Sequence, residues 1–163
     1  MAELTPLDEK LGEVLGLAQA AQDTIKKVAR MEGADPFAAD LERMRSESEE
    51  TERRTLELVE TFEGKKTAII EKGRETKKEA SEMRDTYLGG EEEALDGFEF
   101  MTMAEAGELG HWEIVEKIAS VIGEQRAGDL AGWAVGVHRG HADTIRSASL
   151  TLAEDEAKEM TSG

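Results

Sequence analysis

The chain has 163 residues, of which 37 are acidic and 20 are basic, so its formal net charge at pH 7 is −17. Such a charge repels nucleic-acid phosphates and anionic lipid, and we expect neither nucleic acid nor a membrane as a partner. No cysteine is present, which excludes disulfides, thiolate zinc sites, iron–sulfur clusters and cysteine nucleophiles. Any metal ion must therefore be held by carboxylates and imidazoles.

The length fits a single domain over 1–163. There is no basic-then-apolar signal at the N-terminus and no apolar run near the roughly 18 residues of a membrane span, so a cytoplasmic protein is expected. No stretch alternates β-branched or aromatic residues with polar ones over four or more positions. The absence of this strand signal predicts an all-α protein.

The first predicted helix covers 6–31, with Pro6 at its first position and Gly33 just beyond its end. Apolar residues recur along it at steps of three and four, which is the spacing of one buried helical face. This stripe consists of Leu7, Leu11, Val14, Leu15, Ala18, Ala21, Ile25 and Val28.

The second predicted helix covers 36–63 and begins with Asp35 as N-cap and Pro36 at the first helical position. Its inward stripe is apolar at both ends, but Ser48 and Glu52 interrupt it in the middle. The buried face of this helix is therefore polar at its middle.

Residues 65–90 are the least apolar part of the chain, with five sizeable hydrophobic residues among many Lys, Glu and Arg. We judge this too little to bury a full helical face. The expected structure is a partly helical crossover on the outside of the bundle, ending at the Gly89-Gly90 pair.

Two further long helices are predicted over 91–121 and 125–160, with Gly123 between them and an acidic tail over 154–163. Four long helices with one long connection between the second and the third are typical of a ferritin-like antiparallel four-helix bundle with a single crossover.

Polar residues interrupt all four inward stripes near the middle of each helix, where antiparallel packing would bring them together. Glu108 and His111 stand one helical turn apart, which is the spacing at which bundles direct metal ligands inward. A His-x-x-His pair follows on the last helix. The candidate ligands are Glu52, Glu105, Glu108, His111, His138 and His141, with Gln22 opposite them on the first helix.

Three interpretations of this cluster are open, because burying an ionisable group without a partner costs several kcal/mol. The cluster binds a metal, its members pair with one another, or the buried stripe is rotated by one residue and the glutamates flank it. Internal pairing would make His138 and His141 charged partners of Glu105 and Glu108 and would raise the pKa of both histidines.

Four glycines, Gly128, Gly132, Gly136 and Gly140, recur every four residues along one face of the last helix. Each costs about 1 kcal/mol of helix propensity relative to alanine. Close approach of another helix would offset that cost, so we predict a tight helix contact there, either within the bundle or across a homodimer.

The segment Leu-Gly-His-Trp-Glu-Ile over 109–114 resembles the Val-Glu-His-Tyr-Glu-Ile segment of the YciE/YciF-like group of ferritin-like bacterial stress proteins. The layout is also similar, with a Glu-rich second helix ending in glycine, an irregular crossover and a His-aromatic-Glu helix. The resemblance implies an antiparallel four-helix bundle, commonly dimeric, with a carboxylate-rich centre similar to di-iron sites.

The chain departs from the pattern of that group at four positions, where Gln22 replaces a Glu, Glu52 falls near a His, Gly110 replaces a Glu and His138 replaces a carboxylate. Fewer carboxylates argue against a ferroxidase centre with bridging glutamates. An imidazole-rich site suits Zn, Fe, Ni or Cu better than Mg or Ca.

We therefore expect a ferritin-like stress or metal-handling protein that binds a transition metal, iron first and zinc or manganese as alternatives. The competing hypothesis is a non-catalytic helical scaffold or protein-interaction module with an internally paired polar layer and no metal.

Overall fold

A computed structural model describes residues 2–162 of the protein, and within this range it contains five α-helices and no strand. The all-α prediction is confirmed. The helices are α1 (Pro6–Ala29), α2 (Ala38–Val59), α3 (Lys66–Leu88), α4 (Ala94–Ile122) and α5 (Gln125–Ser162), and a short 3-10 turn, η1 (Asp35–Phe37), precedes α2.

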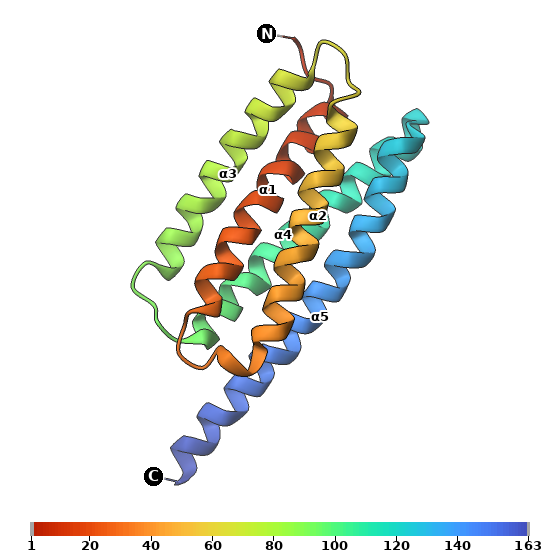
Figure 1. The fold of residues 1–163 in the computed structure, drawn as a ribbon. Coiled ribbons are helices and arrows are strands. Elements are labelled where there is room, and N and C mark those ends of the chain that lie inside the picture. The colour runs from red at the N-terminus through yellow and green to blue at the C-terminus, as the bar shows by residue number, and fades with distance from the viewer. Residues whose placement is uncertain (1, 163) are drawn as a thin grey trace.

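Successive helices run in opposite directions and lie side by side along one common axis (Figure 1). Because α3 returns along the length of the others, α4 starts at the same end as α2 and runs in the same direction. The central helix is α1, which packs against α2, α3 and α4, while α4 and α5 form the other close pair.

Local signals explain where the helices begin and end. Thr5 caps α1 by accepting a hydrogen bond from the backbone N–H of Asp8, whose carboxylate accepts one from the Thr5 backbone N–H in return. Gly123 ends α4 with a φ of 74°, in the left-handed region that glycine adopts without strain. Asp35 was predicted to cap α2, but no side chain caps that helix, and the chain enters it through the η1 turn.

The predicted crossover at 65–90 is wrong in one respect, since α3 is a continuous helix of 23 residues. It buries only Ala68, Ile69, Gly73 and Leu88. Few buried side chains suffice because α3 packs by close backbone approach rather than by a wide apolar face. A Cβ added to Gly16 of α1 would lie 2.3 Å from the carbonyl oxygen of Gly73.

The tight glycine contact within the bundle is therefore between α1 and α3, and not on α5 as one of our alternatives had it. A Cβ added at Gly136 or Gly140 would meet no described atom within 4 Å, and one at Gly132 would meet only the carboxylate of Glu116, at 3.4 Å. A homodimer contact along this face stays a prediction.

The core consists of two apolar clusters with a polar layer between them. One cluster gathers around Leu11, Trp112 and Val115, and the other around Met44, Phe98 and Ile145. The buried polar residues between the clusters are Ser48, Thr51 and Thr55 on α2, Glu105 and Glu108 on α4, and His138 and His141 on α5.

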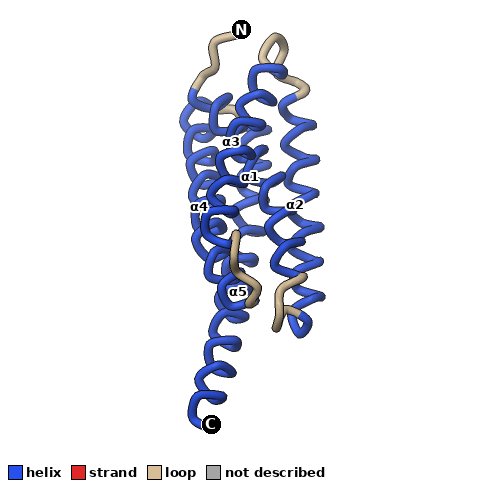
Figure 2. The backbone as a smooth tube through the Cα atoms, turned by 90° about the vertical axis from the view of Figure 1, so that its left-hand side faces the viewer, coloured by secondary structure: helices blue, strands red, loops and turns tan. Residues whose placement is uncertain are grey.

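The last turns of α5 extend beyond the other helices (Figures 1 and 2). Residues 153–162 remain helical, and every one of them is exposed. None of the described helices combines the length and the apolarity that a membrane crossing needs.

Candidate metal centre

The centre is built from residues one helical turn apart on two neighbouring helices. Glu105 and Glu108 are three residues apart on α4, and His138 and His141 are three apart on α5, so each pair projects from one side of its helix. The relative exposure of the four side chains is 8%, 4%, 0% and 1%, respectively. Two imidazoles and two carboxyl groups are thus enclosed at the level where α4 and α5 pack together.

Glu105 is at the centre of this group. Its Oε1 lies 2.5 Å from Nδ1 of His138, within hydrogen-bond distance, and 3.9 Å from Nδ1 of His141. One ligand atom from each of these three residues lies within 4.8 Å of the other two. Glu108 extends the group, since its Oε1 is 3.8 Å from Nε2 of His138.

Several polar atoms of the group have no hydrogen-bond partner among the described residues. These are Oε1 of Glu108, Nε2 of His138 and both ring nitrogens of His141. A buried polar atom without a partner costs about 1–3 kcal/mol, and four such atoms among neighbouring side chains are unusual in a packed core. The same atoms are the donor types that bind transition metals, so the group can hold a metal ion.

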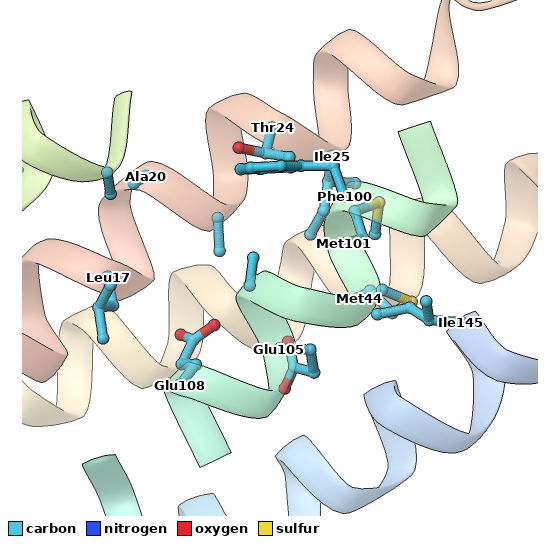
Figure 3. A pocket seen from close by; sticks show the side chains of 13 residues that line it. Leu17, Ala20, Thr24, Ile25, Met44, Phe100, Met101, Glu105, Glu108 and Ile145 are labelled. Atoms are coloured by element: carbon cyan, nitrogen blue, oxygen red, sulfur yellow. The ribbon is translucent and has the colours of Figure 1, made fainter. Parts of the chain in front are cut away.

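A small apolar cavity of about 50 Å³ adjoins the carboxyl groups (Figure 3). Glu105 and Glu108 line it together with Leu17 and Ile25 of α1 and Phe100 of α4. The side chains of Glu105 and Glu108 are only 8% and 4% exposed, so bulk solvent hydrates the two carboxyl groups poorly. Burial accordingly raises the pKa of Glu105 to about 8 and that of Glu108 to about 7.

The imidazole of His141 responds to burial in the opposite sense. Burial, together with the charges of His138 and Arg43, lowers the pKa of His141 to about 3, so this ring is neutral at physiological pH. The raised pKa that internal pairing predicts for His141 is therefore wrong. A neutral imidazole is the form that binds a metal ion.

Two of the six predicted ligands lie outside this group. Nε2 of His111 is 3.1 Å from Oε2 of Glu13 on α1, and its Nδ1 is 2.7 Å from the carbonyl oxygen of Gly107. Glu52 accepts a hydrogen bond of 3.0 Å from Gln22. His111 has the same three-residue spacing from Glu108, but it lies at the margin of the buried face, where its ring meets Glu13 and the Gly107 carbonyl instead of the centre.

Sequence reasoning missed Glu47, which is the glutamate of α2 nearest to the centre. Its Oε1 is 3.5 Å from Nε2 of His141, and its side chain is 33% exposed. Glu47 immediately precedes the buried Ser48, and this neighbouring position on the polar break of α2 was the available signal.

Comparison of the chain with protein-family models, with curated proteins and with solved structures finds no match in any of the three.

Proposed function

We propose that the protein binds a transition-metal ion through Glu105, His138 and His141, with Glu108 as a further carboxylate, and that it is a ferritin-like metal-handling protein. The observation that carries the proposal is the set of buried donor atoms without partners, which converge from α4 and α5. Iron is the proposed metal, with zinc and manganese as alternatives, because imidazole and carboxylate together suit all three.

The order and direction of the helices support the ferritin-like part of the proposal. Bundles of that class have one long connection between their second and third helices. Here α3 forms that connection, since it follows α2 in the chain, runs back along the length of the bundle and leads into α4. The stress-protein assignment rests on the resemblance of 109–114 and stays a prediction.

The residues around the centre would prepare it for a metal ion in two ways. Burial raises the pKa of Glu105 to about 8 and that of Glu108 to about 7, so near pH 7 the metal-free protein holds protons on these carboxyl groups that metal uptake would release. The neutral ring of His141 needs no deprotonation. A bound ion would supply Lewis-acid chemistry and, in the case of iron, redox chemistry.

The scaffold alternative has one observation in its favour, the hydrogen-bond contact between Glu105 and His138. In a layer stabilised by internal pairing, the other buried polar groups should also have hydrogen-bond partners. His141 has no hydrogen-bond partner among residues 2–162, so the pairing is incomplete. We therefore favour the metal-binding function.

The test is metal analysis of the full-length protein purified without chelator or affinity tag, followed by thermal unfolding with added Fe²⁺, Zn²⁺ or Mn²⁺. We expect about one ion per chain and a rise in melting temperature, since a ligand that binds only the folded state stabilises it. Substoichiometric metal in every preparation, with no stabilisation by any of the three ions, would contradict the proposal.

The double variant H138A/H141A should lose the metal-dependent stabilisation. The matched control is H111A, which removes the remaining histidine but one that pairs with Glu13 outside the centre. Equal loss of metal binding in both variants would place the site elsewhere.

A further inference from the structure

The seam between α2 and α5 carries an acidic groove on the outside of the bundle. Its volume is about 670 Å³, and four glutamates of α2 line it opposite Trp133 of α5. These are Glu47, Glu49, Glu50 and Glu52. Acidic surfaces of this kind raise the local concentration of cations, but exposed glutamates alone define no site.

Glu47 differs from the other three because it connects the groove with a buried, unpartnered imidazole. Its carboxylate lies partly in solvent, and its Oε1 is 3.5 Å from Nε2 of His141. The side chain of His141 is 1% exposed and has no hydrogen-bond partner in the described part of the chain. Glu47 therefore lies between the groove and the imidazole of His141.

Arg43 holds the same oxygen of Glu47. Its Nη1 donates a 2.9 Å hydrogen bond to Oε1 of Glu47, and its Nη2 donates one of 3.0 Å to Oγ1 of Thr144 on α5. The guanidinium is thus tied across the seam beside His141. A divalent cation placed between Glu47 and Nε2 of His141 would compete with Arg43 for the Glu47 carboxylate, and it would meet the positive charge of the guanidinium there.

We propose that Glu47 is the solvent-side ligand of the metal centre and that Arg43 is a competing cation, which an incoming divalent metal ion must displace from Glu47. This inference rests on the proposed function and names the entry side of the same site. It assigns Arg43 a role that opposes metal binding, although Arg43 touches none of the ligands on α4.

The chain offers a close control for Arg43. Arg43 pairs with Asp40 and Glu47, at i−3 and i+4, and Arg45 pairs with Glu42 and Glu49 in the same pattern on the same helix. Among the described residues, the hydrogen bonds of Arg45 go only to these two carboxylates of α2. R43Q and R45Q therefore change the net charge equally, and only R43Q releases Glu47.

The experiment measures the binding of Co²⁺ to the full-length protein, at equilibrium and by stopped-flow absorbance. R43Q should accelerate uptake and raise the affinity for Co²⁺ about tenfold, because a like charge next to the ion is removed. R45Q should stay within about twofold of wild type, since its charge is distant and screened. T144V leaves the charge of Arg43 in place but removes its anchor on α5, and it should produce a smaller rise.

The ligand role of Glu47 is tested by comparing E47Q with E49Q. Glu49 lines the same groove but does not contact His141. E47Q should lower the affinity at least about tenfold, as losses of supporting groups at metal sites do, and E49Q should change it little. All four residues substituted on α2 have partly or largely exposed side chains, so the variants are expected to fold, and circular dichroism verifies this.

Two results would overturn the inference while leaving the proposed function intact. One is binding of Co²⁺ that depends on His138 and His141 but responds equally to E47Q and E49Q. The other is an R43Q variant that binds no better than R45Q. Absence of Co²⁺ binding to the wild-type protein would overturn both the inference and the proposed function.

Discussion

Burial has opposite effects on stability at the two ends of the bundle and in its middle. At each end, apolar side chains around Trp112 or Phe98 fill the interior, and burial stabilises the fold. In the middle, the same helices enclose carboxyl and imidazole groups of which four atoms have no hydrogen-bond partner in residues 2–162. This contrast, a layer that costs stability between two that supply it, is what supports the metal-binding proposal.

The largest expected effect tests the apolar end. Phe98 is 1% exposed and packs edge-on against Phe37, with ring centroids 5.4 Å apart. Phe98→Ala should lower the free energy of unfolding by about 3–5 kcal/mol, because it leaves a cavity. The control Ile114→Ala, on the exposed side of α4, should stay within about 0.5 kcal/mol. Urea denaturation measures both, and a loss below 1 kcal/mol for Phe98→Ala would show that the cluster packs loosely.

The second prediction inverts the first, since removing polar groups from the middle should stabilise the metal-free protein. Replacing Glu105 by Met and His138 by Leu together should raise the free energy of unfolding by about 1–4 kcal/mol when a chelator is present. The same variant should gain nothing from added metal. A loss of stability in chelator would instead mean that the Glu105–His138 contact is structural and would favour the scaffold hypothesis.

The third prediction concerns pH and follows from the shifted pKa values. Glu105 and Glu108 have folded-state pKa values of about 8 and about 7, above the ordinary 4.5, so the stability that they contribute is present below 4.5 and is lost as pH rises. His141, lowered from 6.5 to about 3, contributes stability that is present above 6.5 and is lost as pH falls. Between pH 6.5 and 8, the carboxyl groups decide the sign.

In that interval, the metal-free protein should become less stable with rising pH, while the stabilisation by added Zn²⁺ should grow because the ligands must be deprotonated. Urea denaturation at four pH values, with chelator and then with Zn²⁺, measures the two opposite slopes. The double variant Glu105→Gln with Glu108→Gln should flatten the metal-free slope. A metal-free slope that the double variant leaves unchanged would assign the effect to other groups.

The smallest effect compares two glycines in differently packed surroundings. Gly136→Ala, on the open face of α5 near the polar layer, should raise the free energy of unfolding by up to about 1 kcal/mol through helix propensity. Gly16→Ala, 2.3 Å from the Gly73 carbonyl oxygen, should lower it because the α1–α3 contact must open. Thermal unfolding of the two variants gives the comparison, and a destabilising Gly136→Ala would point to a second copy packed on that face.

Residues close together in the chain account for the part of the centre that the sequence predicted. Glu105, Glu108, His138 and His141 interrupt apolar stripes on two helices, and all four are buried at one level. Side chains three residues apart share a side of a helix whatever surrounds it. His111 fits the same spacing but turns to Glu13, because the spacing alone does not say which neighbour a side chain at the margin of the stripe will meet.

The sequence by itself determined that the chain is helical, that helices end at Gly33, Gly64 and Gly123, where the structure shows positive φ, and that polar residues enter the core near mid-helix. These properties are local, because they depend on propensity, caps and a period of 3.6 residues. Only the tertiary structure decided that α3 is a complete helix docked through Gly16 and Gly73, and that Glu47 rather than Glu52 faces the histidines. The two glutamates differ by about 140° around α2, so the choice between them depends on how α2 is rotated about its axis, which packing against α1 and α5 sets.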